Sequence, residues 1–129
     1  MGQEGVGARA TVLDAGALVA LERGDRRARA LIADAEGRII IPAAALAEVW
    51  RDGARQAALA ALVKASATTI DVLDEQVAKA VGILCGRTGT SDIADASVVL
   101  SARRHRAIVL TSDADDLLRL DPGLQVEAL

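Results

Sequence analysis

Short apolar runs alternate with longer segments of helical periodicity along most of this chain. β-Strands are predicted for Ala10–Leu13, Arg38–Ile41, Thr68–Ile70 and Ala107–Leu110, with a further edge strand at Leu124–Val126. The run Arg38–Ile41 is rich in β-branched residues and shows no polar alternation, which is typical of a parallel strand covered on both faces.

Helices are predicted for the segments between these strands. They are Ala15–Glu22, Arg26–Ala35, Ala43–Arg51, Ala54–Ala65, Asp74–Leu84, Asp92–Arg104 and Asp113–Leu120, and Thr90 or Ser91 can cap the sixth of them. Strands that alternate with helices indicate the α/β class with a parallel sheet covered on both sides. We expect a flexible Gly-rich tail at residues 1–9 and a single domain at residues 10–129.

Composition narrows the function classes. The 129 residues are 52% hydrophobic and 26% charged, which is typical of a globular domain, and the net charge of −3 argues against a nonspecific electrostatic DNA binder. Trp50 is the single aromatic residue, so base stacking on an aromatic platform is not expected. Thirteen of the fifteen cations are Arg, and those clustered at 23–29 and 103–106 either lie on solvated helix faces or hold RNA phosphate locally.

Cysteine and histidine are too scarce for a thiolate or imidazole metal centre. Cys85 and His105 each occur once, so we expect neither a disulfide framework nor a zinc site. The first residues lack the apolar core of a signal peptide, and no apolar run approaches the ~18 residues of a membrane span. A cytoplasmic protein without membrane contact is therefore expected.

Acidic residues follow the predicted strands at four places. Asp14 ends the first strand, and Glu48 lies in the helix after the second; Asp92 and Asp95 open a later helix, and Asp113, Asp115 and Asp116 follow the fourth strand. The carboxyl ends of parallel strands lie along one edge of a sheet, where ligands bind. Converging carboxylates repel one another unless a cation lies between them, and hard oxygen ligands suit Mg²⁺ or Mn²⁺.

Each acid also has an ordinary structural interpretation. Asp14 and Asp113 can be helix N-caps, and Glu48 can lie on a solvated helix face. Asp92 and Asp95 share a helix face, where like charges cost about 0.2–0.5 kcal/mol, although the helix dipole favours both. Asp95 is embedded among apolar residues, a costly setting for an unpaired charge.

Taken together, these segments resemble the PIN-domain family, and within it the VapC-like toxins of type II toxin–antitoxin pairs. The resemblance runs from Ala10 to Val126. It rests on Val12-Leu13-Asp14 with the apolar helix that follows, on Pro42 to Val49 with Glu48, on Ser91 to Leu100 with Asp92 and Asp95, and on Val109 to Leu117 with Asp113 and Asp116.

The resemblance implies a three-layer α/β/α sandwich and a metal-dependent endoribonuclease, a hydrolase acting on phosphodiester bonds. By residue match, Asp14, Glu48, Asp92 and Asp113 are the expected catalytic acids, Asp95 and Asp116 are further candidate ligands of Mg²⁺ or Mn²⁺, and Thr111 and Ser112 are expected to orient a phosphate or water. Whether Asp113 or Asp116 is the closer ligand stays open. The expected partners are an RNA substrate, a cognate antitoxin protein and a second copy of the chain, and metal-activated water is the expected nucleophile.

Three alternatives stand beside this interpretation. The first is a PIN-type nuclease that acts in RNA processing without a toxin role. The second is a receiver-like signalling module, although Ala15-Gly16 follows Asp14 and no Lys follows the fourth strand; Gly16 also disfavours a phosphatase of the haloacid dehalogenase type, which has an Asp at that position. The third is a metal-free protein-interaction domain.

Overall fold

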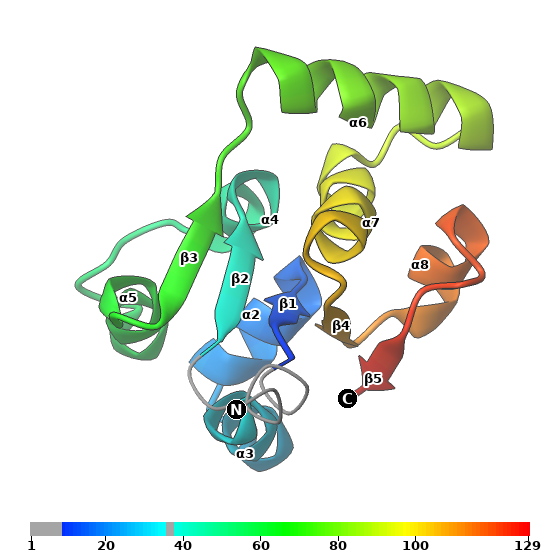
Figure 1. Cartoon of the computed structure of the whole chain (residues 1–129). Coiled ribbons are helices and arrows are strands. Elements are labelled where there is room, and N and C mark those ends of the chain that lie inside the picture. The colour runs from blue at the N-terminus through cyan, green and yellow to red at the C-terminus, as the bar shows by residue number, and fades with distance from the viewer. Residues whose placement is uncertain (1–8, 36–37) are drawn as a thin grey trace, which may run out of the picture.

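A five-stranded, entirely parallel sheet forms the centre of the molecule in the computed structural model, which describes residues 9–35 and 38–129. The strands are β1 (Thr11–Leu13), β2 (Ile39–Pro42), β3 (Thr68–Asp71), β4 (Ile108–Thr111) and β5 (Val126–Ala128), in the order β3-β2-β1-β4-β5 (Figure 1). Receiver-like domains have the order 2-1-3-4-5. The receiver-like alternative is therefore wrong on topology.

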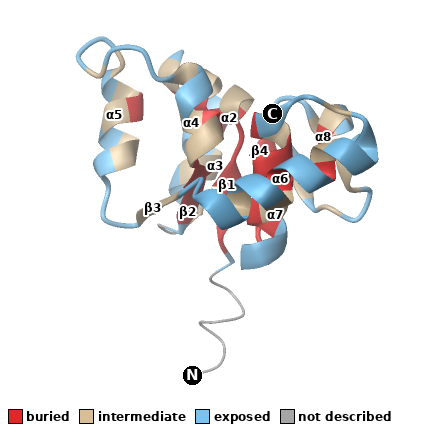
Figure 2. Ribbon diagram, turned by 90° about the horizontal axis from the view of Figure 1, so that it is seen from above, coloured by how far each residue is buried: buried red, intermediate tan, exposed pale blue. Residues whose placement is uncertain are grey.

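Helices cover both faces of the sheet and complete a three-layer α/β/α sandwich (Figures 1 and 2). They are α2 (Ala15–Glu22), α3 (Arg26–Asp34), α4 (Ala43–Val49), α5 (Ala57–Lys64), α6 (Glu75–Thr88), α7 (Ile93–His105) and α8 (Ala114–Leu120). None of these described helices combines the length and the apolarity that a bilayer crossing requires.

Alternation along the strands divides the core into two clusters. Val12, Ile40 and Val109 face α6, α7 and α8, whereas Leu13, Ile41 and Leu110 face α2, α3 and α5. These side chains are almost fully buried, because each strand of a doubly covered parallel sheet has no solvent face. Helix α4 contributes to both clusters and packs against α2 and α7.

Several predicted boundaries are wrong for local reasons. Helix α5 begins at Ala57 rather than Ala54, because the Gln56 side chain accepts from the backbone N–H groups of Arg51 and Asp52 and holds that segment as a loop. Helix α6 continues to Thr88, and Gly89 ends it in a left-handed conformation with φ of 76°. The tail predicted for residues 1–9 lies outside the described residues, apart from Arg9, whose Nε donates to Arg106 O at 3.3 Å.

Candidate active site

Asp14 lies at the carboxyl end of β1, where it is 4% exposed and fixed by hydrogen bonds. Ala17 N–H donates to Asp14 Oδ1 at 2.8 Å, so the residue is the N-cap of α2, and Thr111 Oγ1 donates to Asp14 Oδ2 at 2.5 Å. Burial raises the pKa of Asp14, against the lowering effect of the hydrogen bonds from Thr111, Ala17 and Gly16. The structure therefore holds this carboxylate in one orientation at an electrostatic cost.

Gly16, at the start of α2, also shapes the surroundings of Asp14, a role that the sequence pattern did not indicate. A Cβ at this position would collide with Ser112 Oγ and stand 3.4 Å from Asp14 Oδ1. Glycine therefore allows the turn after β4 to approach the start of α2. The two hydroxyls predicted to orient a phosphate or water differ in their surroundings, because Thr111 is buried while Ser112 is exposed.

Asp92 and Asp95 lie at the amino end of α7. Asp92 is the N-cap and accepts from Asp95 N–H at 2.9 Å, so the cap is Asp92 itself rather than Thr90 or Ser91. The pKa of Asp95 is raised to about 7, first by burial and then by the charges of Asp92, Asp14 and Asp116. The charges that raise this pKa come from the start of α2, the start of α7 and α8, so acids of three separate elements lie close together.

Asp113 and Asp116 complete this group from the start of α8. A hydrogen bond with Asp116 raises the pKa of Asp113, with smaller contributions from burial and from the charges of Asp116 and Asp14. The Asp113 side chain does not cap α8, and its backbone N–H donates to Thr111 Oγ1 at 2.8 Å. Thr111 therefore links Asp14 to the turn that carries Asp113.

A hollow of about 310 Å³ lies between the end of α6, the start of α7 and α8. It is lined by Thr88, Gly89, Thr90, Asp92, Asp95, Asp116, Arg119 and Leu120. We call this the acid hollow. Asp95 on its wall is subject to the charge of Asp14, so the hollow adjoins the carboxyl end of β1, the edge where parallel topology predicts a ligand site.

Glu48 is not joined to this group by any hydrogen bond or ion pair within the described part of the chain. Its side chain is exposed on α4 and lines a different hollow, of about 260 Å³, with Glu22, Arg23 and Arg51. Helix α4 nevertheless packs against α2 and α7, the two helices capped by Asp14 and Asp92. The backbone places Glu48 on a neighbouring element, while its side chain points to another surface.

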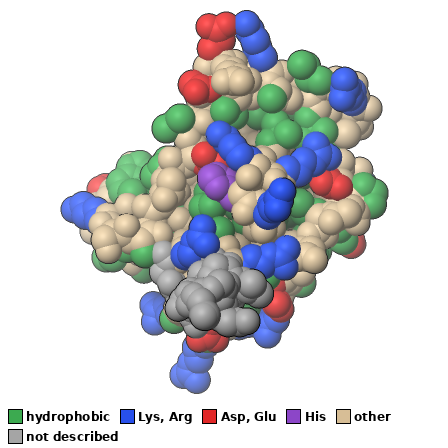
Figure 3. All heavy atoms as spheres, in the orientation of Figure 1, with side chains coloured by type: hydrophobic (Ala, Val, Ile, Leu, Met, Phe, Trp, Pro, Cys, Tyr) green, Lys and Arg blue, Asp and Glu red, His purple; other side chains and the backbone are tan. Residues whose placement is uncertain are grey.

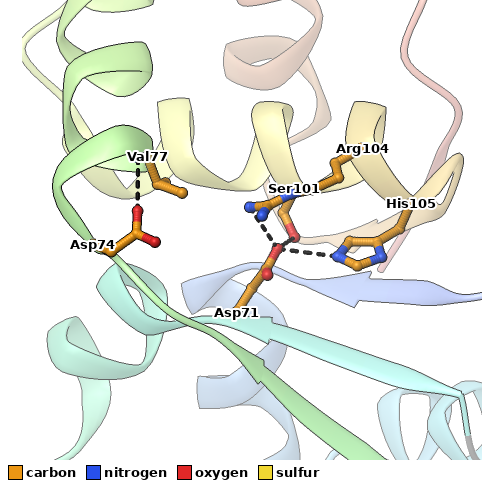
Figure 4. Close-up of polar contacts among 6 residues, drawn as sticks. All are labelled: Asp71, Asp74, Val77, Ser101, Arg104 and His105. Atoms are coloured by element: carbon orange, nitrogen blue, oxygen red, sulfur yellow. Dashed lines mark hydrogen bonds and ion pairs between the residues drawn. The ribbon is translucent and has the colours of Figure 1, made fainter.

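Asp71, an acid that the sequence analysis did not single out, ends β3 at the same edge of the sheet (Figure 4). Its Oδ2 accepts from Ser101 Oγ at 2.6 Å and lies 3.2 Å from both Arg104 Nη2 and His105 Nε2. Asp71 therefore attaches the edge strand to the last turns of α7. A strand-end carboxylate like Asp14 could have been found from the sequence, but the partners of Asp71 could not.

The chemistry of this donor set fits a divalent cation. The acids carry surplus negative charge, because the charges of neighbouring acids add to burial in raising the pKa of Asp95 and add to the Asp116 hydrogen bond in raising that of Asp113. Oxygen donors suit Mg²⁺ or Mn²⁺. Within residues 9–35 and 38–129, no three His, Cys, Asp or Glu side chains are already arranged to hold one ion. Mg²⁺ keeps several waters, so one or two direct carboxylates are sufficient.

Comparison with known proteins agrees with this architecture. Residues 11–121 match the PIN domain family. No curated protein sequence matches the chain. Among solved structures, VapBC2 from Rickettsia felis bound to a DNA fragment from its promoter aligns with a TM-score of 0.70 and 16% identity over 93% of this chain and 98% of that one.

Two further structures are similar. FitAB bound to the IR36 DNA fragment aligns with a TM-score of 0.65 and 15% identity, over 92% of this chain and 94% of that one. FitAcB from Neisseria gonorrhoeae aligns with a TM-score of 0.61 and 19% identity, over 90% and 95%. These likenesses establish a shared fold, and the family match spans most of the sequence. The chain belongs to the PIN domain family.

Proposed function

We propose that this chain is a divalent-metal-dependent endoribonuclease and the toxin of a type II toxin–antitoxin pair. PIN domains are nucleases, and the similar structures are described as VapBC and FitAB assemblies. The observation that carries the proposal is the convergence of Asp14, Asp92, Asp95 and Asp116. Burial first, and then repulsion from the other three acids, raise the pKa of Asp95 to about 7. A cation at this place relieves that repulsion.

The residues of the chain have separable tasks in this reaction. Asp14, Asp92, Asp95 and Asp113 would hold Mg²⁺ or Mn²⁺, with Asp116 beside them and Glu48 joining if its side chain turns toward Asp14 at the start of α2. The bound ion supplies Lewis acidity and lowers the pKa of a coordinated water, which makes hydrolysis feasible at neutral pH. Thr111 fixes the orientation of Asp14, and the N-cap contact fixes Asp92.

The decisive experiment compares cap residues inside and outside the acid hollow. Asp92 caps α7 through Asp95 N–H at 2.9 Å. Asp74 caps α6 through Val77 N–H, also at 2.9 Å (Figure 4). Asn is also a good cap, so Asp92→Asn and Asp74→Asn should both fold. We expect Mn²⁺-dependent cleavage of RNA to disappear in Asp92→Asn and Asp14→Asn and to persist in Asp74→Asn.

Equal cleavage by Asp92→Asn and the unaltered chain would remove the mechanism. Calorimetry that detects no Mn²⁺ binding would instead favour a metal-free interaction domain. The RNA target is read by sequencing the 5′ ends of fragments after brief expression, with Asp14→Asn as the inactive control.

An RNA-processing nuclease would use the same acid hollow, but it would have no antitoxin partner. A toxin is accompanied by an antitoxin reading frame, and we propose that the antitoxin covers the acid hollow. Co-expression of the neighbouring reading frame should suppress growth arrest and RNA cleavage. The expected cytoplasmic location stays a prediction.

We also propose that two copies associate through the outer face of α6. Leu73 and Ile93 are exposed by 42% and 53% beside a mainly apolar hollow of about 330 Å³, and hydrophobic side chains gather over this part of the molecule in Figure 3. Added Cβ atoms at Gly82 and Gly86 would meet nothing within 4 Å. Ala78 and Gly86 lie four residues on either side of Gly82, so two antiparallel copies of α6 could approach closely about Gly82.

A further inference from the structure

Arg119 stands on the wall of the acid hollow, in the last turn of α8. It lines the hollow together with Asp92 and Asp95, and it is the one cation among the described residues that do so. Its Nη1 lies 2.7 Å from Asp116 Oδ1, while 75% of the side chain is exposed. The guanidinium is thus held at one edge and open to solvent over most of its surface.

The ion pair between Arg119 and Asp116 has little value as a stabilising device. It joins two residues three apart on one short helix, and exposed pairs of this kind contribute about 0–1 kcal/mol. The ion pair instead fixes the position of Arg119, because Asp116 holds the guanidinium beside the acids of the hollow. The positive charge of Arg119 also acts to lower the pKa of Asp113, so its field reaches the amino end of α8.

An acidic hollow needs such a cation if it is to accept a phosphodiester. The chain carries a net charge of −3, and each carboxylate around the hollow repels an approaching phosphate. Arg presents five N–H donors in a planar fork that matches two phosphate oxygens. Asp116 engages Nη1 of Arg119, which leaves donors of the same fork available to a ligand.

We propose that Arg119 contacts the phosphate of the RNA at the acid hollow, and that Asp116 positions Arg119 rather than holding the metal ion. This inference rests on the proposed nuclease function and separates the roles of the two acids on α8. Asp113, whose side chain does not cap the helix, is then the metal-binding acid of this element. Arg119 is a substrate-binding residue, and Asp116 is a positioning residue.

The competing explanation is that Arg119 neutralises the carboxyl end of the α8 dipole. Lys would serve that purpose equally but lacks the planar fork. Arg119→Ala, Arg119→Lys and Asp116→Asn therefore form one series. Arg55→Ala is the matched control, since Arg55 is also exposed and lies three residues from its partner Asp52, outside the acid hollow.

The series is assayed with Mn²⁺ on two probes whose cleavage needs no particular RNA sequence. They are bis(p-nitrophenyl) phosphate and a fluorescently labelled single-stranded RNA of mixed sequence. We expect Arg119→Ala to lower kcat/KM about 100-fold, as loss of a charge-stabilising donor does, with Arg119→Lys retaining part of the activity. Arg55→Ala should match the unaltered chain.

Two further readouts separate substrate binding from support of the fold. In an Asp14→Asn background, loss of one phosphate contact should reduce the slope of log affinity for RNA against log salt by about 0.7. The Mn²⁺ concentration for half-maximal activity should be unchanged in Arg119→Ala and Asp116→Asn and raised in Asp113→Asn.

Unaltered cleavage by Arg119→Ala would overturn the assignment of Arg119 and leave the proposed function intact. A rise in the Mn²⁺ requirement of Asp116→Asn equal to that of Asp113→Asn would overturn the positioning role of Asp116. Absence of metal-dependent cleavage by the unaltered chain on both probes would overturn the proposed function, and this inference with it.

Discussion

The Thr111 hydroxyl donates to Asp14 Oδ2 at 2.5 Å across 97 residues of sequence. Both side chains are buried, Thr111 completely, and they come from the ends of the neighbouring strands β4 and β1. The same Thr111 oxygen accepts from Asp113 N–H at 2.8 Å. One hydroxyl therefore links the acid after β1 to the turn before α8, and the two sides of the site are built as a unit.

Replacing Thr111 with Val should separate these two sides without changing the volume of the core. The Asp14 carboxylate would lose a buried hydrogen bond, which costs about 1–3 kcal/mol of folding free energy. Because this bond lowers the pKa of Asp14, its loss should raise that pKa further and weaken Mn²⁺ binding. Urea denaturation and calorimetry measure the two effects, and Thr111→Ser, which keeps the hydroxyl, should restore Mn²⁺ affinity.

The raised pKa of Asp95 predicts how stability depends on pH in the metal-free protein. The pKa is about 7 when folded and 3.8 in the reference state, so the folded protein keeps a proton that the unfolded chain has released. Stability is therefore highest below pH 3.8 for this group and falls as the pH rises through 7. We expect a loss of about 1–2 kcal/mol, since partial exposure screens the repulsion.

Urea denaturation across this pH range, with and without Mn²⁺, tests the dependence. Mn²⁺ should flatten the profile by neutralising the cluster, and Asp95→Asn should flatten it without metal. A decline as steep in Asp95→Asn as in the unaltered chain would assign the effect to another group.

The convergence of the acids follows from sequence because it depends on the backbone alone. Asp14, Asp92 and Asp113 sit at strand ends or helix starts, and parallel topology brings such positions to one edge whatever the side-chain conformations. Glu48 is different, since the direction of an exposed side chain on α4 depends on rotamer choices that no hydrophobic pattern encodes.

Contacts between distant side chains were likewise beyond prediction. The bonds of Asp71 to Ser101, Arg104 and His105 depend on how α7 is set against β3, about 30 residues away in sequence. The loop before α5 depends on one side chain, Gln56, satisfying three backbone groups: it accepts from Arg51 N–H and Asp52 N–H and donates to Val49 O at 2.8 Å. Local propensity favoured an earlier start of the helix in this Ala-rich segment, and these side-chain bonds of Gln56 override it.

Gly16→Ala should damage the site more than the fold. The new methyl group would collide with Ser112 Oγ and crowd Asp14, so the turn after β4 must move away from α2. We expect a loss of RNA cleavage of at least tenfold, with a destabilisation of about 1–3 kcal/mol. The double variant Gly16→Ala/Ser112→Gly removes the colliding side chain, and recovery of cleavage in it would show that this contact is responsible. A single variant as active as the unaltered chain would contradict the account.

The α6 surface predicts a variant that changes assembly while leaving each copy folded. A side chain added at Gly82 has open space in the single copy, and any residue other than Gly or Pro favours the helix by up to about 1 kcal/mol. Gly82→Lys should therefore keep or raise the melting temperature of the monomer. It would also place a long charged side chain where two α6 helices must approach closely.

Light scattering coupled to size-exclusion chromatography should show a dimer for the unaltered chain and a monomer for this variant. Ala61→Lys, on the exposed side of α5, is the matched control and should stay dimeric. A Gly82→Lys protein that remains dimeric at the same concentration would place the contact between copies on another face.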